Sequence, residues 1–418
     1  MRTAVGLPAS TASVLKPLPL PDKPSVAVLP FTNMSGDPEQ EYFADGMVED
    51  IITALSRFKS LFVIARNSTF TYKGRAVDVK QVGKELGVRY VLAGSIRNNG
   101  DRLRITGQLI DARTGAHLWA ERFDGAVANV FELQDEVTDK VVWAINPALE
   151  QAEIDNARRT DTINPDAYDQ YLRGMAQIYL FTRKGNEAAL PFFARATELD
   201  PEFAAAHAMA GWSFVQRKSH GWSEDHAMEA EHARQHAETA VDLARDDAVV
   251  LARAGHTLAY LVGDLDRGKL FIDRALSLNP NLAAAWYVSG WLRIWLGDPK
   301  LALEHLARVV RLSPRDAMMP GIQGAIAFAL FFAGRVDEAA AQAEEILRER
   351  PRFHQALRAA AMSHSLAGRF DEAHRAMTKL REVDGRLRIS NLRDLTPLRR
   401  EQDIARYEEG LRKAGLPE

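Results

Sequence analysis

The sequence contains no cysteine, which excludes disulfide bonds, thiolate nucleophiles and cysteine metal sites. It also lacks an excess of one charge, because 53 Lys and Arg residues against 56 Asp and Glu residues give a formal net charge of −3. Proteins that bind nucleic acid or anionic lipid usually carry a basic surface, so neither partner is expected. Its 418 residues, 46% hydrophobic and 26% charged, predict a globular protein of two or three domains, or one domain and a repeat array.

Long unbroken apolar runs are also missing. Residues 1–24 contain five prolines and no apolar core of the length that a secretory signal needs, so we predict an extended leader or linker over residues 1–23. Eighteen uncharged residues separate Asp316 from Arg335, but a proline and three glycines interrupt them. We interpret this stretch as a buried repeat helix and expect no direct insertion into a membrane.

The common catalytic signatures are absent as well. No GxxxxGK[ST] sequence, no strand-linked GxGxxG and no GxSxG occurs. We therefore predict no catalytic residue, no cofactor and no metal site, and we expect that the protein is not an enzyme.

Two side-chain clusters test that expectation. Asp45, Glu49 and Asp50 would lie on one helix and could form an acid/base or cation site, but acidic residues near a helix N-terminus usually form a solvated face, which is the interpretation we favour. His232 and His236 have the i, i+4 spacing that can chelate a metal. No HExxH surrounds them, so we favour histidines on a solvated repeat helix.

The N-terminal part alternates apolar β-type runs with helical patterns. Asn99-Gly100 is a hairpin-turn pair, and the strand after it alternates buried-type and polar residues. The pattern predicts strands over 25–31, 61–65, 90–97, 102–109 and 117–123, and helices over 43–58, 79–86 and 129–150. This order is typical of a small mixed-sheet α/β domain, which we place at residues 24–155.

The C-terminal part repeats a phrase of Gly, Ala and Pro. Pro280, Pro314 and Pro351 recur with a period near 34 residues, which is the length of a tetratricopeptide helical hairpin. Aligning on this phrase places hairpins at about 167–201, 202–245, 247–280, 281–314, 318–351 and 352–385. We therefore predict an all-α tetratricopeptide-repeat solenoid over residues 160–385, with a C-terminal capping helix region over 386–418.

The N-terminal domain resembles a known family. The runs PSVAVLPFTNMSGDPEQEYFADGMVEDIITALSRF and GVRYVLAGSIRNNGDRLRITGQLIDARTGAHLWAERFDG are similar to the TolB N-terminal-like (FlgO-like) domain over about 120 residues. In that family the domain often lies between a bacterial signalling module and a tetratricopeptide array. The signalling module is commonly an adenylate or guanylate cyclase domain or a CadC-like regulator, and no segment here resembles a cyclase catalytic core. The resemblance implies the C-terminal regulatory half of such a protein.

Tetratricopeptide arrays present a concave groove, and aromatic residues recur at the groove positions of this one. An aromatic stripe in a groove suits an extended peptide or an apolar helix, although such rings more often pack against neighbouring helices. If the groove interpretation is right, Trp291→Ala should weaken partner binding and leave thermal stability nearly intact. The predicted partner-binding residues are Trp212, Arg253, Tyr287, Trp291, Trp295, Phe328 and Phe332.

We therefore expect a non-enzymatic bacterial signalling scaffold whose groove binds a protein or peptide partner. The alternative is the regulatory half of a split or truncated adenylate cyclase-family protein, with its catalytic domain missing or on another chain. We expect a cytoplasmic location, with a periplasmic or envelope-associated location as the alternative. The sequence leaves the oligomeric state and the identity of the partner open.

Overall fold

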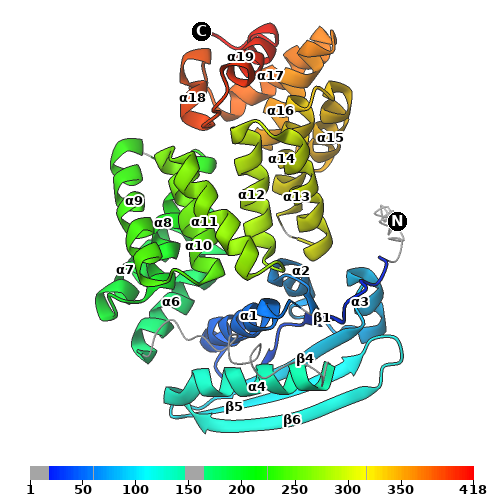
Figure 1. Ribbon diagram of the computed structural model, residues 1–418, viewed down its shortest axis with the longest axis vertical. Helices are drawn as coiled ribbons and strands as arrows, with labels where there is room; N and C mark the ends of the chain where they lie inside the picture. Colours follow the sequence, from blue (N-terminus) through cyan, green and yellow to red (C-terminus); the bar gives the residue numbers. More distant parts are fainter. Residues whose placement is uncertain (1–17, 60, 146–163, 224, 317) are drawn as a thin grey trace, which may run out of the picture.

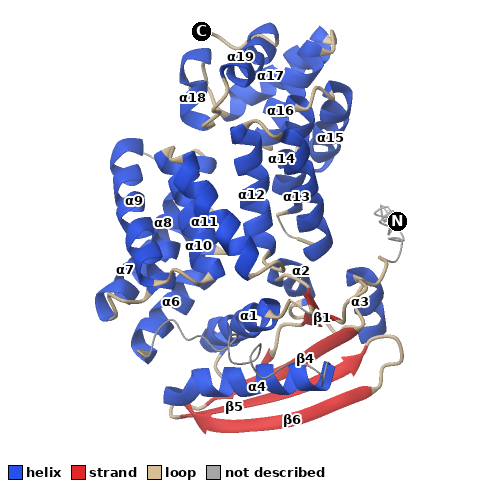
Figure 2. Cartoon of the chain, viewed as in Figure 1, coloured by secondary structure: helices blue, strands red, loops and turns tan. Residues whose placement is uncertain are grey.

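The computed structural model describes residues 18–59, 61–145, 164–223, 225–316 and 318–418. A mixed α/β domain is followed by an all-α tetratricopeptide-type solenoid, which confirms the predicted fold class (Figure 1). The α/β domain lies against one end of the helical array, so that α1 (Glu41–Arg57) faces the helices (Figure 2). This placement, which the sequence did not indicate, determines the surroundings of the candidate site.

The sheet of the α/β domain has the strand order β3-β1-β4-β5-β6, and β2 also pairs with β4. β1 pairs in parallel with β3 and β4, whereas β4, β5 and β6 form the antiparallel meander that the alternating pattern predicted. The strands are β1 (Ser25–Val28), β2 (Thr32–Asn33), β3 (Phe62–Val63), β4 (Tyr90–Asn98), β5 (Arg102–Asp111) and β6 (His117–Ala126).

Helices cover both faces of this sheet. Leu92 of β4 joins the core formed with α1 and α4 (Val130–Ile145), and its neighbour Val91 joins the core under α3 (Val79–Leu86). Successive strand residues point to opposite faces, so this alternation follows directly from the strand geometry. The predicted extension of α4 to residue 150 lies outside the described residues.

A short helical segment after β3 was not predicted. It consists of α2 (Arg66–Thr69) and a 3₁₀ turn, η2 (Phe70–Tyr72). Its sequence, RNSTFTY, has neither a repeating apolar pattern nor a strong capping signal, so it reads as a loop. In the structure this segment lies against the repeats, because Ser68 and Asn67 bond to Ser313 and Asp316.

The solenoid consists of antiparallel helix pairs, each closed by close packing between its two helices. At Gly290, for example, an added Cβ would lie 2.7 Å from the Leu306 side chain, so the small residue is needed for the helix contact. The pairs are α6 (Pro165–Ile178) with α7 (Arg183–Leu199), α8 (Ala204–Ser219) with α9 (His226–Leu243), α10 (Ala248–His256) and the π-turn η4 (Thr257–Val262) with α11 (Leu265–Leu278), α12 (Ala283–Leu296) with α13 (Pro299–Leu312), α14 (Met319–Phe332) with α15 (Val336–Glu349), and α16 (His354–Leu366) with α17 (Phe370–Val383).

The C-terminal segment turns back over the array after α17. It contains η5 (Ile389–Asn391), α18 (Leu392–Leu395) and α19 (Glu401–Lys413). α19 packs on α16, where Gly410 lies against Met362. Ahead of it, the Arg399 amide donates to the Trp295 carbonyl at the end of α12. The segment therefore lies across earlier repeats as well as on the last one.

Candidate functional site

The seven predicted groove residues all lie on the first helices of their pairs. Trp212 is on α8, Arg253 on α10, and Tyr287 on α12. Trp291 and Trp295 follow on α12, and Phe328 and Phe332 are on α14. The structure divides the seven into two groups according to what covers them.

The group on the C-terminal side is enclosed in the core of the array. Trp291 and Phe328 are 8% and 2% exposed, and their ring centroids lie 5.5 Å apart. Trp295 stacks on the Tyr260 ring at 5.3 Å, and Phe332 is also buried. In this structure the four rings pack against neighbouring helices, which is the alternative that the sequence left open.

Tyr407 of α19 covers two of these rings. Its ring lies 6.2 Å from Phe328 and 6.4 Å from Phe332, and its hydroxyl accepts a hydrogen bond of 2.9 Å from buried Arg358. The expectation that Trp291→Ala would spare stability does not fit this packing, because removing a buried indole leaves a cavity. A partner could reach these rings only if α19 moved away.

The other group lines a cavity of about 270 Å³ between the two domains. Trp212, Arg253 and Tyr287 form part of its wall on the side of the array. The other side is formed by α1 and by the chain around α2, including Asp50 and Arg66. A cavity of this size at a domain boundary is a typical place for a ligand or for a partner's side chains.

Glu49 and Asp50 of α1 face this boundary, which corrects the prediction of a solvated helix face for these two residues. Asp50 accepts hydrogen bonds from Tyr168 of α6 and from Gln134 of α4 (2.9 Å). Asp45 pairs with Lys73, and Glu49 accepts from Tyr179 of α6 at 2.7 Å. The prediction was wrong because the array covers a helix face that would be exposed in an isolated domain.

Burial raises the pKa of Asp50 to about 7, although its bonds to Tyr168 and Gln134 act in the opposite direction. A raised carboxyl pKa in a cavity is one sign of an acid/base catalyst, but buried structural carboxyls show it too. Both donors to Asp50 belong to helices that meet at the domain boundary. The arrangement is that of a polar contact that fastens α1 to α4 and α6.

Most other charges around the cavity are paired. Arg66 lies 3.2 Å from Glu49 and stacks over the Tyr179 ring at 4.3 Å. Arg57 and Asp247 form an ion pair of 2.9 Å between α1 and the first residue before α10. These pairs compensate Glu49 and Asp247, which are two of the five carboxyl groups that line the cavity.

Arg253 differs from these side chains. Its guanidinium lies 3.9 Å from the centroid of the Trp212 ring, and no hydrogen bond or ion pair of that guanidinium occurs among the described residues. The Trp212 side chain is 8% exposed, yet its Nε1 has no hydrogen-bond partner within the described structure. A buried indole N–H usually has an acceptor. The Trp212 N–H is therefore a hydrogen-bond donor without an acceptor, and it belongs to the ring on which the Arg253 guanidinium lies.

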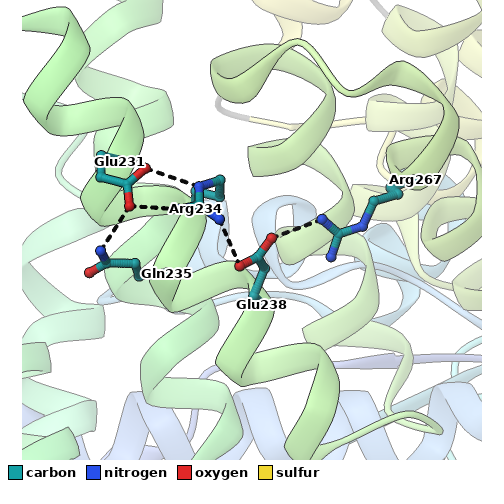
Figure 3. A network of polar contacts seen from close by, with 5 residues as sticks. All are labelled: Glu231, Arg234, Gln235, Glu238 and Arg267. Atoms are coloured by element: carbon teal, nitrogen blue, oxygen red, sulfur yellow. Dashed lines mark hydrogen bonds and ion pairs between the residues drawn. The ribbon is translucent and has the colours of Figure 1, made fainter.

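On the second, outer helices of the pairs, α9 and α11, arginines do form ion pairs. Arg234 of α9 bonds to Glu231 and Glu238, and Glu238 also accepts from Arg267 of α11 at 2.8 Å (Figure 3). Gln235 completes this network by donating to Glu231 at 2.9 Å. The charges of this network are therefore matched locally, whereas Arg253 on the inner face has no ion pair among the described residues.

Two asparagines at the domain boundary were missed by the sequence analysis. Asn281 is 5% exposed and donates to the carbonyls of Ser56 (3.1 Å) and Leu61 (3.0 Å), and Asn279 donates to the Ser56 hydroxyl at 2.7 Å. The aligned repeats contain a sequence difference that could have indicated these contacts. The residue after the turn proline is charged in three other copies, as Glu202, Arg315 and Arg352, and it is Asn only at position 281.

A second set of contacts reaches the next turn of the array. The hydroxyls of Ser68 and Ser313 lie 3.1 Å apart and both residues are fully buried. Arg315 pairs with Glu85, and Arg311 donates to the Gly87 carbonyl at 3.1 Å. Ion pairs and hydrogen bonds therefore hold the two domains together along much of their boundary.

The histidine pair singled out in the sequence does not form a chelate. His232 is exposed, whereas His236 faces His207 of α8, with their Nδ1 atoms 3.1 Å apart, so His236 is not the solvated residue that was expected. Burial lowers the pKa of His236 to about 4. Within the described ranges, no group of three or more His, Asp or Glu side chains is placed to hold a metal ion. No helix in the described part of the chain has both the length and the apolar character needed to span a membrane.

Comparison with protein families gives a match over the α/β domain. Residues 22–140 match a family described as HilA/YgeH-like transcriptional regulator, second domain. The match overlaps the two segments from which a TolB N-terminal-like domain was expected. The family match covers less than half of the chain.

A similar protein from Rhizobium meliloti (strain 1021) carries the name "Putative adenylate cyclase 3". It is 51% identical over 192 residues, which are 46% of this chain and 33% of the relative. The chain thus covers about a third of the length of this relative.

Among solved structures, the chain is similar to PilW, described as a widely conserved type IV pilus biogenesis factor, with 14% identity and a TM-score of 0.42 over 56% of this chain and 97% of the other. It is also similar to YrrB, described as a TPR protein with an unusual peptide-binding site. That likeness has 21% identity and a TM-score of 0.32 over 46% of this chain and 93% of the other. Neither likeness says what this chain binds.

Proposed function

We propose that this chain is a regulatory scaffold that binds a protein partner through the inner face of its array, and that its α/β domain controls access to that face. The observation that carries the proposal is the covered inner face. The α/β domain closes one part of it around Arg253, and Tyr407 of α19 fills another part. A surface that already accepts two segments of its own chain has the shape and apolar character to accept a segment of a partner.

The proposed contact residues are the seven of the aromatic stripe. Trp212, Arg253 and Tyr287 are accessible from the cavity, so we expect a partner to contact them first. Contact with Phe328 and Phe332 would require displacement of α19, and contact with Trp291 and Trp295 would require their helices to separate. The chain is then a binding protein with no reaction chemistry of its own. We also propose that the α/β domain is a TolB N-terminal-like domain and that the protein is cytoplasmic.

Affinity capture from the native host, with the full chain as bait, tests the proposal. Arg253→Glu reverses the charge at the inner face and should remove the captured partner. Arg274→Glu is the matched control, because Arg274 lies on outer helix α11 and is exposed. Asn281→Ala should increase capture, because it weakens the contact that holds the α/β domain over the inner face. A partner captured equally well by all four forms would contradict the proposal.

A second candidate function is favoured by the relative from Rhizobium meliloti. Its name and 51% identity support a regulatory half of an adenylate cyclase-family protein, with the catalytic domain missing or on another chain. In this case the partner would be a cyclase catalytic domain. Adding the purified chain to such a domain from the same host should change its rate of cyclic AMP formation at least severalfold, and an unchanged rate would exclude this candidate.

A further inference from the structure

One guanidinium at the wall of the cavity between the domains forms no ion pair with a described side chain. Glu49 is held by Arg66 and Tyr179, and Asp247 is held by Arg57. Asp316 accepts from Asn67 at 3.1 Å and from the Met318 amide at 2.8 Å. Arg253 remains as a partly buried guanidinium without an acidic partner in the described chain.

A second donor at the same wall is also unfilled. Trp212 is more than nine-tenths buried and lines the cavity, and its indole Nε1 has no acceptor among the described residues. Buried donors without acceptors are rare, because each forfeits the hydrogen bond it would make with water. Together, Arg253 and Trp212 offer N–H donors, and the Arg253 guanidinium has no ion pair among the described residues.

The rest of the wall is apolar or aromatic. Tyr171, Tyr179, Phe181 and Tyr287 line the cavity along with aliphatic side chains. Such walls bind flat apolar groups, while a few polar atoms fix the orientation of the ligand. A guanidinium presents a planar fork of donors that matches a carboxylate, whereas a phosphate dianion would require further positive charge.

We propose that this cavity binds a small aromatic monocarboxylate, with its carboxylate on Arg253 and the Trp212 indole N–H and its ring among the aromatic side chains. Residues from both domains line the cavity, so a bound ligand contacts both. Ligand binding therefore stabilises the docked arrangement of the domains. The site goes beyond the scaffold function, because it requires no protein partner and is tested on the purified chain alone.

The test uses naphthalene-2-carboxylate as the probe and naphthalene-2-carboxamide as its neutral counterpart. Titration calorimetry on the full chain should show saturable binding of the carboxylate, at least tenfold tighter than that of the amide. In the NMR spectrum, the indole N–H signal that is missing from Trp212→Phe should shift when the carboxylate is added to the unmodified chain. The carboxylate should also raise the melting temperature.

Variants separate this site from a nonspecific apolar surface. Arg253→Gln should abolish the preference for the carboxylate, and Arg253→Lys should retain part of it, because the charge remains without the planar fork. Trp212→Phe should weaken carboxylate binding severalfold while preserving a ring. Arg274→Gln, on the outer face, should bind as the unmodified chain does.

The proposal is overturned if the folded, unmodified chain shows no saturable binding at millimolar carboxylate. It is also overturned if the carboxylate and the amide bind equally, or if the Trp212 indole signal does not move. Loss of probe binding would leave capture of a protein partner by the inner face unaffected. The scaffold function and the ligand site can therefore fail separately.

Discussion

Two halves of one aromatic stripe behave differently in this molecule. Trp291, Trp295, Phe328 and Phe332 are core residues, and the C-terminal helix packs on two of them. Trp212, Arg253 and Tyr287 occupy equivalent helices but line a cavity shared with the α/β domain.

The difference shows that repeat position alone does not decide whether a groove residue is available. Each half is covered by a segment distant in sequence, the C-terminal helix in one case and the α/β domain in the other. The C-terminal helix packs directly on the aromatic rings and leaves no room for a ligand. The α/β domain is held by polar contacts around a cavity, and this cavity has room for a ligand. Predictions about this array must therefore consider the covering segment together with the repeat.

The largest expected loss of stability comes from a substitution among the four buried aromatic residues of α12 and α14. Trp291→Ala should lower the free energy of unfolding by about 3 to 5 kcal/mol, because it leaves a cavity between Trp295 and Phe328. Tyr287→Ala should cost less, about 1 to 2 kcal/mol, because its ring already borders a cavity. Denaturation followed by circular dichroism checks the order, and equal losses would mean that the two halves are packed alike.

Removing a boundary contact should have the next largest effect. Asn281→Ala leaves two buried backbone carbonyls without their donor and should cost about 2 kcal/mol. Glu202→Ala changes the equivalent position of another turn, where the side chain is exposed, and should be nearly neutral. Thermal melts and hydrogen exchange at residues 56–61 provide the measurement. If both variants behaved alike, Asn281 would not fasten the domains.

Asp50 should make stability depend on pH. Its pKa is raised from 3.8 to about 7 in the folded chain, so its stabilising contribution is complete below pH 3.8 and is lost as the pH rises through about 7. Asp50→Asn keeps a neutral group beside Gln134 and Tyr168. The variant should therefore exceed the unmodified chain by roughly 1 to 3 kcal/mol at pH 8, and the gap should narrow towards pH 5.

Urea denaturation of both forms at pH 5, 6, 7 and 8 measures this gap. The neighbouring titratable groups Glu49, Arg57 and Tyr168 are present in both forms, so the difference isolates Asp50. A gap that did not change with pH would mean that the Asp50 carboxyl is ionised across the whole range.

The smallest effect is expected on the outer surface. Glu238→Gln removes the charge that Arg234 and Arg267 share (Figure 3). Exposed ion pairs contribute little, so the loss should stay below about 0.5 kcal/mol and should shrink further at high salt. A loss well above about 0.5 kcal/mol would show that this network stabilises the array more than exposed ion pairs usually do.

The sequence predicted the fold well because the fold depends on local periodicity. The Gly, Ala and Pro phrase marked the helix pairs, and alternation around Asn99-Gly100 marked the meander. It could not predict the site equally well, because the surroundings of Asp50 and Trp291 are set by contacts between distant segments. The segment 66–72 was missed for the same reason, since its role appears only where Ser68 meets Ser313.

An engineered cross-link between the domains tests most directly whether the α/β domain covers the array. The chain has no cysteine, so Ser68→Cys with Ser313→Cys introduces a single possible disulfide where two buried hydroxyls lie 3.1 Å apart. Mild oxidation should form this bond in nearly all molecules, whereas Ser68→Cys with Ser277→Cys, on the outer face, should stay reduced. Free thiols in the first variant that react as fast as those in the second would show that the α/β domain does not cover the array.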